Sequence, residues 1–164
     1  MNRTKALDII RICRHEMRDN VDEFKIAGSY RRGATMPGDL DIIIIPKKGY
    51  LLQDCLPISY DEVNWLGEKK AQIVIKGEKV DIHATTVDSF GAARMYFTGP
   101  KSWNIGMRIL ARKMGYKLNE YGLFSLETGM WEAGRFEKDI FFKLKKPWKA
   151  PHRRGKSYPE GKVI

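Results

Sequence analysis

The feature that most constrains the fold of this chain is an acidic pair followed by an uninterrupted apolar run. Asp39 and Asp41 are separated by a single residue and lead into Ile42-Ile43-Ile44-Ile45. Residues two apart on a β-strand point to the same face, so the two carboxylates are expected to lie side by side. Four consecutive isoleucines predict a strand that is buried on both faces. The chain is therefore expected to fold around a central strand with two carboxylates at its start.

A second motif precedes this strand. Gly28 and Ser29 end an apolar stretch over residues 24–27 and open a predicted short helix. The first turn of a helix offers free backbone N–H groups to a phosphate. For Ser29 taken alone, a helix N-cap is the favoured explanation, and the two roles are compatible because both use the same helix start. Paired carboxylates are a hard-oxygen site suited to Mg²⁺. A phosphate cradle beside a metal-binding acidic pair is the arrangement of a nucleotidyltransferase.

Asp81 supplies a third carboxylate. It lies between Val80 and Ile82, so a strand would point it to the face opposite these apolar neighbours, the face assigned to Asp39 and Asp41. Three carboxylates from two adjacent strands can hold two Mg²⁺ ions roughly 3.5–4 Å apart. The alternative is that Asp81 is a surface acid on an edge strand.

The excess of positive over negative charge lies entirely in the C-terminal part of the sequence. Residues 1–90 contain 14 Lys and Arg and 14 Asp and Glu, whereas residues 91–164 contain 16 and 6 and so account for the net charge of +10. A basic half attached to a carboxylate centre predicts a polyanionic partner, most simply nucleic acid. The alternative is that the excess charge serves only solubility.

The remaining composition narrows the class of protein. Cys13 and Cys55 are the only cysteines, and their spacing matches neither a zinc site nor a disulfide framework. Reduced thiols favour an intracellular, cytoplasmic protein, or one at a viral replication site or in the virion if the chain is viral. No apolar run approaches the ~18 residues that cross a membrane. We expect no membrane association and a monomer.

The pattern predicts an α+β fold with a mixed β-sheet and flanking helices at 1–88, followed by a small, mostly helical, basic subdomain at 89–164. A helix is expected over 4–19, with a less regular stretch at 47–68. Gly77-Glu78 is a predicted tight turn between two strands. The expected strands are 24–27, 39–46, 71–76 and 79–84. A helical region at 89–117 is interrupted at Gly99-Pro100, and a hairpin, a helix from Glu137 and an extended tail from Lys143 follow.

These motifs carry a family resemblance. Gly28-Ser29-Tyr30-Arg31-Arg32-Gly33 with Gly38-Asp39-Leu40-Asp41 resembles the palm motif of the X family of DNA polymerases, the group of DNA polymerase β. Tyr96-Phe97-Thr98-Gly99, followed by Asn104 and Arg108, resembles the nucleotide-selecting segment of that family. Asn119-Glu120-Tyr121 and Glu137-Lys138-Asp139-Ile140-Phe141 continue the match. The resemblance covers about residues 24–150 and is strongest to the minimal viral members that lack a lyase domain.

The resemblance implies a role for each matching residue. Asp39, Asp41 and Asp81 would be the catalytic, metal-binding residues for two Mg²⁺ ions, for which Mn²⁺ would substitute. Gly28, Ser29, Arg32 and Gly38 would contact the triphosphate of a dNTP. Tyr96, Phe97 and Gly99 would lie along its sugar, Asn104 would bind the minor-groove edge of its base, and Arg108 would touch the template strand.

The basic tail is the candidate for gripping duplex DNA. It contains Lys143, Lys145, Lys146, Lys149, Arg153, Arg154 and Lys156. Trp148 within it would either stack on a base or dock the tail onto the core. The alternative is a solvated terminus without function.

Two departures from the family pattern bear on the prediction. The chain begins almost at the palm motif, so we expect no deoxyribose-phosphate lyase activity. Lys79 stands where an Arg is expected two residues before Asp81, which affects the tuning of that carboxylate. No exonuclease cluster of acids is visible, so no proofreading is expected.

The predicted function is template-directed, Mg²⁺-dependent addition of deoxynucleotides to a primer, filling short gaps during DNA repair, with a DNA ligase as a possible partner in the pathway. Two alternatives stay open from the sequence. One is a nucleotidyltransferase acting on an RNA end, an antibiotic or a protein, which would prefer ATP to dATP. The other is a DNA-binding module without catalytic activity.

Overall fold

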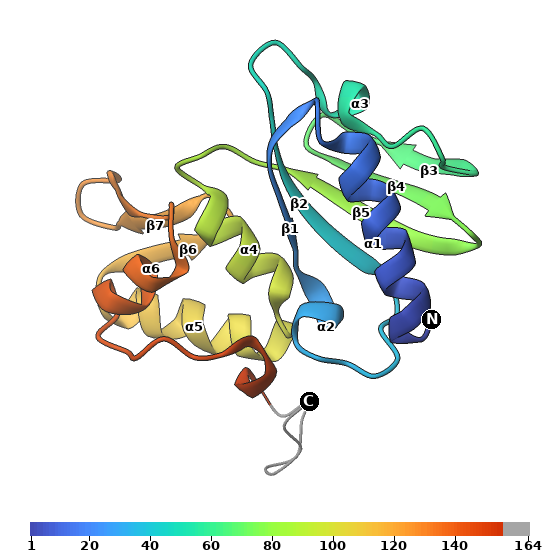
Figure 1. Ribbon diagram of the computed structural model, residues 1–164. Helices are drawn as coiled ribbons and strands as arrows, with labels where there is room; N and C mark the ends of the chain where they lie inside the picture. The colour runs from blue at the N-terminus through green and yellow to red at the C-terminus, as the bar shows by residue number, and fades with distance from the viewer. Residues whose placement is uncertain (156–164) are drawn as a thin grey trace. The chain divides into compact units, whose positions relative to one another are not determined.

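The computed structural model describes residues 1–155. The chain divides into two compact units, an N-terminal unit spanning Met1–Thr86 and a C-terminal unit beginning at Val87. Figure 1 shows a larger sheet covered by a long helix in the N-terminal unit, and three helices with a small sheet in the C-terminal unit.

The N-terminal unit is built on a five-stranded sheet in the order β1-β2-β5-β4-β3. The strands are β1 (Val21–Ile26), β2 (Leu40–Pro46), β3 (Glu62–Leu66), β4 (Lys70–Ile75) and β5 (Glu78–Ala84). β2 and β5 are parallel neighbours, whereas the other pairs are antiparallel. The predicted Ile run lies in β2, near the centre of the sheet, and is buried along its whole length.

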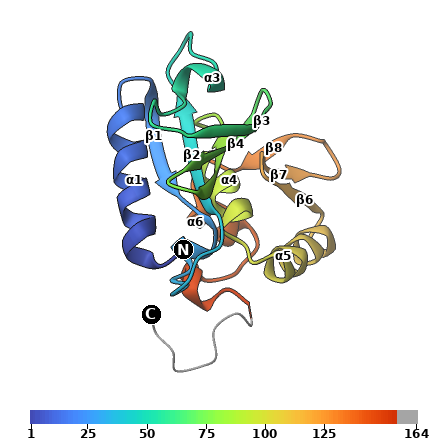
Figure 2. The same cartoon turned by 90° about the vertical axis from the view of Figure 1, so that its right-hand side faces the viewer.

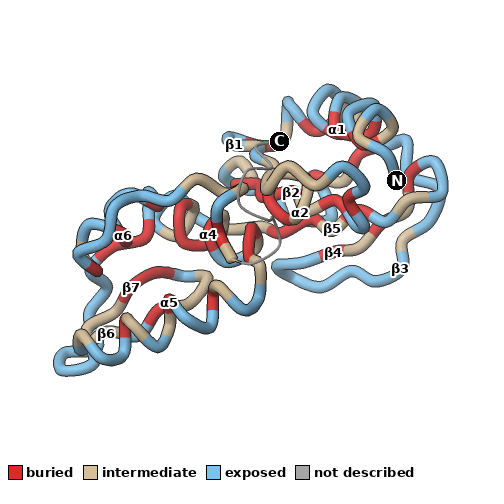
Figure 3. The backbone as a smooth tube through the Cα atoms, turned by 90° about the horizontal axis from the view of Figure 1, so that it is seen from below, coloured by how far each residue is buried: buried red, intermediate tan, exposed pale blue. Residues whose placement is uncertain are grey.

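One face of this sheet packs against helix α1 (Arg3–Met17), as Figures 1 and 2 show. The Oδ1 atom of Asn2 caps this helix by accepting a hydrogen bond of 2.8 Å from the backbone N–H of Lys5. Apolar side chains at helical spacing then meet alternate residues of the strands. The shared core contains Ala6, Ile9, Ile10, Cys13 and Met17 of the helix with Leu40, Ile42, Ile44, Ala71, Ile73, Val80 and Ile82 of the sheet. Figure 3 shows buried positions along β2 and β5.

The predicted strands at 24–27, 39–46, 71–76 and 79–84 are all present within a few residues. The turn between β4 and β5 is formed by Lys76 and Gly77, both with positive φ, one residue earlier than predicted. Strand β3 was not predicted. It is an edge strand whose residues are mostly exposed, so it lacks the apolar alternation that marks a strand in a sequence. The short helices α2 (Gly28–Arg31) and α3 (Leu52–Cys55) complete the unit.

The C-terminal unit combines helices α4 (Phe90–Thr98), α5 (Lys101–Lys113) and α6 (Glu137–Lys143) with a three-stranded sheet. The strands are β6 (Tyr116–Asn119), β7 (Gly122–Ser125) and β8 (Trp131–Ala133), and a short 3-10 helix, η1, covers Pro151–Arg153. The break at Gly99-Pro100 is confirmed, but the helical region ends at Lys113 and not at 117. Gly91 allows close approach of α4 to the chain at Phe136, because a Cβ there would meet backbone atoms at 2.5 Å.

Both cysteines are free, and both are buried. Burial raises the pKa of Cys13 to about 12, so its thiol stays protonated at neutral pH. Among residues 1–155, no helix is both long and apolar enough to cross a bilayer.

Candidate active site

The paired register of β2 and β5 places two of the three predicted carboxylates together. Asp41 lies directly opposite Asp81 in the parallel pairing, and the flanking residues Leu40, Ile42 and Val80 point into the core with α1. Both carboxylates therefore lie on the face of the sheet opposite α1. The side-chain alternation read from the sequence is confirmed for this pair.

Asp81 belongs to an interior strand, so its interpretation as a surface acid on an edge strand is wrong. Its Oδ1 atom accepts a hydrogen bond of 2.8 Å from Nε2 of Gln72, which lies opposite it on β4. Burial raises the pKa of the Asp81 carboxyl, and the negative charge of Asp41 adds to this effect. The hydrogen bond from Gln72 and the charges of Lys70 and His83 act in the other direction. The pair thus concentrates negative charge in a partly dehydrated site.

His83 is the member of the site that was not predicted. It follows Asp81 by two residues on β5, and its Nε2 atom donates a hydrogen bond of 3.0 Å to Oδ1 of Asp41. The His83 side chain is only 3% exposed. One ligand atom each from Asp41, Asp81 and His83 lies within 4.8 Å of the others. The spacing Asp81-x-His83 on a predicted strand already placed both side chains on one face, and this signal could have identified His83 from the sequence.

Asp39 lies just outside this group. Strand β2 begins at Leu40, so the prediction that both acids of the motif lie within the strand is wrong by one residue. Asp39 is exposed and is not among the three residues whose ligand atoms converge. Its role as a metal ligand stays a prediction.

Gly28 lies against the carboxylate of Asp41. The glycine has a φ of +62°, and a Cβ atom at this position would clash with Oδ2 of Asp41. The backbone N–H of Ala27 donates a hydrogen bond of 2.9 Å to the carbonyl oxygen of Asp41, which ties the start of α2 to β2. The glycine of the Gly-Ser motif is therefore required by its contact with Asp41, independently of any phosphate.

The predicted helix after Gly28 is confirmed, but Ser29 is not its N-cap. Ala27 occupies that position, and Ser29 lies inside the single turn of α2. Arg32 is half-buried at the C-terminal end of this turn. Gly38 is exposed and has free space around the position of a Cβ atom, so no contact among residues 1–155 requires a glycine there. The triphosphate contacts of Ser29, Arg32 and Gly38 remain predictions.

The loop after α2 is held in place by Arg3 of α1. Its guanidinium donates hydrogen bonds of 3.1 and 3.0 Å to the carbonyl oxygens of Tyr30 and Ala34. It also lies 4.0 Å from the centre of the Tyr30 ring. A residue far away in the sequence thus fixes the segment that joins the Gly-Ser motif to the acidic pair.

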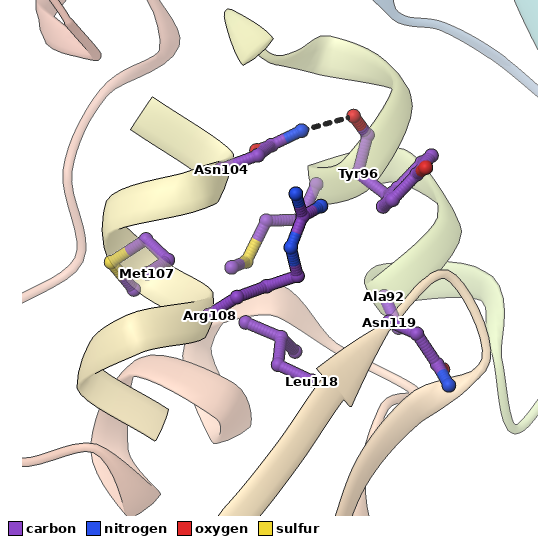
Figure 4. Close-up of a pocket in the computed structure, with 8 residues that line it drawn as sticks. Ala92, Tyr96, Asn104, Met107, Arg108, Leu118 and Asn119 are labelled. Atoms are coloured by element: carbon purple, nitrogen blue, oxygen red, sulfur yellow. Dashed lines mark hydrogen bonds between the residues drawn. The ribbon is translucent and has the colours of Figure 1, made fainter. Parts of the chain in front are cut away.

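In the C-terminal unit, three of the predicted nucleotide and template contacts lie around one small cavity. Tyr96, Asn104 and Arg108 line it together with Ala92, Met95, Met107, Leu118 and Asn119. Figure 4 shows Asn104 and Arg108 on the side of α5 that faces α4. The Nδ2 atom of Asn104 donates a hydrogen bond of 2.7 Å to the carbonyl oxygen of Tyr96, so one donor of this amide is already engaged.

The segment after Tyr96 ends helix α4. Tyr96 packs edge to face on Phe97, with ring centres 5.0 Å apart. Gly99 is the C-cap residue of α4, with a φ of +63° that favours glycine. Contact of Tyr96, Phe97 and Gly99 with a sugar stays a prediction.

The basic tail departs most from its prediction. Arg154 is completely buried, so its inclusion among the DNA-contacting cations is wrong. Its guanidinium donates hydrogen bonds of 3.2 and 2.8 Å to the two carboxylate oxygens of Glu137. The ring centres of Trp103, Phe141 and Trp148 lie 5.0 to 5.7 Å away. This buried pair draws the chain back onto α6, so the prediction of an extended tail is wrong up to residue 155.

Trp148 also binds Glu137, through a hydrogen bond of 3.1 Å from its Nε1 atom. The prediction that it docks the tail onto the core is confirmed. The docked segment forms one wall of an open groove of about 880 Å³, which is lined by the cations Lys146, Lys149 and Arg153 and by His152. Lys145, the residue before Lys146, is exposed. The Nζ atom of Lys143 lies 3.5 Å from a carboxylate oxygen of Glu132. Lys156 lies outside the described residues.

Comparison with known proteins agrees with this arrangement. A family model described as the DNA polymerase beta palm matches residues 3–86, and one described as the DNA polymerase beta thumb matches residues 93–155. The repair DNA polymerase X of African swine fever virus (strain Badajoz 1971 Vero-adapted) is 33% identical over 137 residues, covering 77% of this chain and 78% of the viral protein. The chain belongs to the X family of DNA polymerases.

Larger relatives match over a smaller part of their own length. The DNA polymerase/3'-5' exonuclease PolX of Bacillus subtilis is 31% identical over 130 residues, which cover 74% of this chain and 22% of that protein. DNA polymerase lambda of Rattus norvegicus is 26% identical over 158 residues, which cover 77% of this chain and 28% of the rat protein. The protein is therefore a DNA polymerase whose α+β fold pairs a palm with a thumb, and the family binds DNA and dNTPs.

The residues of the polymerase palm fit a divalent metal. Two carboxylates face each other across adjacent strands, and each has one oxygen engaged by a side chain of the same face, Asp41 by His83 and Asp81 by Gln72. Burial and, to a smaller extent, the charge of Asp41 raise the Asp81 pKa, and a cation between the two carboxylates would oppose both effects. Carboxylate oxygens suit Mg²⁺, and an imidazole within reach also suits Mn²⁺.

Proposed function

We propose that this polymerase adds templated deoxynucleotides to a primer 3′-hydroxyl and fills short gaps in DNA during repair. The observation that carries the proposal is the direct pairing of Asp41 with Asp81 on the face of the sheet opposite α1. The match to the repair DNA polymerase X of African swine fever virus supports the repair role.

The reaction is an in-line displacement at phosphorus. The primer 3′-hydroxyl loses its proton to solvent and its oxygen bonds to the α-phosphorus, while the bond from that phosphorus to the bridging oxygen breaks and pyrophosphate leaves. Two Mg²⁺ ions, when bound, would activate the 3′-hydroxyl and neutralise the charge of the leaving group. Asp41 would hold both ions and Asp81 the one nearer the primer terminus, with Asp39 as the third carboxylate. The protein contributes mainly positioning and charge.

The nucleotide would be held by two sets of residues. Gly28, Ser29, Arg32 and Gly38 would contact its triphosphate. Tyr96, Phe97 and Gly99 would contact its sugar, Asn104 its base and Arg108 the template strand. Asn104 and Arg108 are four residues apart on α5 and so share one face of the helix. Minor-groove acceptors hardly differ between base pairs, so contacts there test pair geometry and not sequence.

The DNA duplex would be gripped by Lys143, Lys145, Lys146 and Lys149. Lys146 and Lys149 support this most directly, because both line the groove beside the exposed Trp148. Cations that neutralise phosphates release counterions, so binding should weaken steeply with salt. The protein would act as a monomer on gapped or primer–template DNA. A DNA ligase would then seal the filled gap.

Primer extension on a duplex with a one-nucleotide gap tests the proposal. Mg²⁺ and each dNTP are supplied singly, with ATP and dATP in competition. We expect incorporation of the templated dNTP, and no preference for ATP. Incorporation should be lost in Asp41→Ala and retained in Asp8→Ala, since Asp8 is an exposed acid of α1 on the opposite side of the sheet.

Three results would contradict the proposal. Incorporation without regard to the template base would indicate a terminal transferase. A strong preference for ATP would indicate a different acceptor. Tight binding of the gapped duplex without incorporation by the wild-type protein would indicate a binding module.

A further inference from the structure

We propose that Gln72 is a positioning residue for Asp81 and that Asn64 sets the orientation of the Gln72 amide. The two amides form a relay that starts on the edge strand β3 and ends at the carboxylate. The relay would fix which oxygen Asp81 presents to a divalent cation. This inference rests on the proposed role of Asp81 in metal binding.

The relay crosses three neighbouring strands on the polar face of the sheet. Asn64 of β3 donates a hydrogen bond of 2.9 Å from Nδ2 to Oε1 of Gln72 on β4. Gln72 in turn donates a hydrogen bond of 2.8 Å from Nε2 to Oδ1 of Asp81 on β5. The register places Gln72 directly opposite Asp81, and Asp81 directly opposite Asp41.

The chemistry of the groups fixes the direction of each bond. An ionised carboxylate only accepts hydrogen bonds, so the Gln72 nitrogen must face Asp81 and its oxygen must face Asn64. Asn64 satisfies that oxygen with its own N–H₂ group. If the Gln72 amide were reversed, its oxygen would face the carboxylate and its nitrogen would face another donor. Both hydrogen bonds would then break together, so Asn64 stabilises the one orientation that supports Asp81.

Asn64 reaches Gln72 from an irregular point of the edge strand. The register of β3 against β4 shifts between Val63 and Trp65, so Asn64 is the residue left without a Cα partner. A regular strand would have paired Asn64 in the ladder. The irregularity coincides with the residue whose side chain meets Gln72.

The two carboxylates of the pair are held by different means. Asp41 is fixed by His83 and by the backbone at Gly28. For Asp81, the side-chain hydrogen bond comes from Gln72. Lys79, which precedes Asp81 by two residues, is exposed and makes no hydrogen bond or ion pair to it among residues 1–155. Support for Asp81 therefore comes from across the sheet and not from its own strand.

The test compares Gln72→Met with Gln53→Met, which replaces the only other glutamine of the chain at an exposed position of α3. Gln72→Met keeps the length of the side chain and removes the donor. We expect kcat for gap filling to fall, and the Mg²⁺ concentration for half-maximal activity to rise, by roughly tenfold in each case, the size typical of weakened support for a metal ligand. The KM for dNTP should not change. Mn²⁺ binding to the protein without nucleotide, followed by electron paramagnetic resonance, should weaken in parallel.

If Gln72→Met folds poorly, variants of Asn64 still test the relay. Asn64 is exposed, so its replacement should not impair folding. Asn64→Ala should weaken Mn²⁺ binding by a smaller factor than Gln72→Met. Asn64→Asp should weaken it more than Asn64→Ala, since the new carboxylate has no hydrogen to donate to the Gln72 oxygen. In a Gln72→Met background, Asn64→Asp should have no further effect.

The outcomes separate the relay from the proposed function. In one outcome, Asp81→Ala destroys activity, whereas Gln72→Met and Asn64→Asp match the wild type in Mn²⁺ binding and Mg²⁺ requirement. The relay would then be wrong, and the proposed function would stand. If Asn64→Asp changes Mn²⁺ binding equally in the wild-type and Gln72→Met backgrounds, it acts through its charge alone and not through Gln72. That result would also overturn the relay. Full activity of Asp81→Ala would instead contradict the proposed function.

Discussion

The two units of this polymerase differ in how the backbone holds their charged side chains. In the N-terminal unit, the carboxylates lie on adjacent interior strands, where the register and the side-chain alternation fix each position. In the C-terminal unit, most cations of the tail lie on an irregular segment that a single buried ion pair draws onto α6. Chemistry at a phosphorus atom requires carboxylates held within fractions of an ångström, whereas contact with a phosphate backbone tolerates mobile charges.

The largest effect is expected from Asp81→Asn. The change removes the charge of a proposed metal ligand, and its loss should cost several kcal/mol of transition-state stabilisation, or roughly 10³-fold in rate. Stability should not fall, because burial and Asp41 raise the pKa of this carboxyl and so disfavour its charged form in the folded protein. Single-turnover gap filling and thermal unfolding measure the two quantities. A variant that keeps its rate would remove Asp81 from the reaction.

Arg154→Met should be the most destabilising change in the C-terminal unit. It removes the cation that balances the buried Glu137 carboxylate, which typically costs ~3–5 kcal/mol of stability. Denaturant unfolding followed by tryptophan fluorescence reports on this unit, since Trp103, Trp131 and Trp148 all lie in it.

Arg153→Met is the matched control for that experiment. Arg153 is the exposed neighbour of Arg154, and its replacement should change stability by less than ~0.5 kcal/mol. The double variant Arg154→Met with Glu137→Gln should recover part of the stability, because no charge is then left buried alone. Equal destabilisation by Arg153→Met and Arg154→Met would contradict the structural role of the ion pair.

Gly28→Ala should affect stability and activity together. The glycine has a φ of +62° and contacts the carboxylate of Asp41, so a methyl group adds backbone strain of ~1–3 kcal/mol and displaces this proposed metal ligand. Gly38→Ala is the control for stability, since its surroundings are open and its φ is not in the left-handed region. Thermal unfolding of the two variants should differ clearly. A neutral Gly28→Ala would show that Asp41 is free to move.

The smallest effects are expected from Lys146→Ala and Lys149→Ala. Each removes one cation of the groove, so DNA affinity should fall a few-fold and the slope of log K against log salt should flatten by about 0.9 for each phosphate that the protein no longer neutralises. Lys48→Ala in the N-terminal unit, at an exposed position, should leave the slope unchanged. A salt series of binding isotherms on gapped DNA distinguishes these variants.

The sequence predicted the face of the sheet that carries Asp41 and Asp81 better than the residues that support these two carboxylates. Alternation along two strands was enough to place Asp41 and Asp81 on one face, because that relation is local to each strand. The contact of Gln72 with Asp81 depends on which strands become neighbours, and residues 72 and 81 carry no signal of it by themselves. His83 was within reach of the same alternation rule and was overlooked.

The tail shows where composition misleads. Arg154 was counted with its neighbours as a solvent-exposed cation, since nothing in a run of basic residues marks one of them for burial. Its burial depends on Glu137 and three aromatic side chains that precede it in the chain by 6 to 51 residues. Strand β3 was missed for a related reason, because an exposed edge strand has no buried face to create a pattern.

In this account the carboxylates of the N-terminal unit act in the chemical step, and the cations of the tail act in DNA binding. The most direct test is single-turnover incorporation on a one-nucleotide gap at saturating DNA. We compare Asp41→Ala with the double variant Lys146→Ala with Lys149→Ala. We expect the double lysine variant to react at close to the wild-type rate once its DNA is bound, whereas Asp41→Ala should be slower by roughly 10³-fold at the same bound fraction. A lysine variant that is slowed as much as Asp41→Ala would contradict the account, because the cations would then act in the chemical step itself.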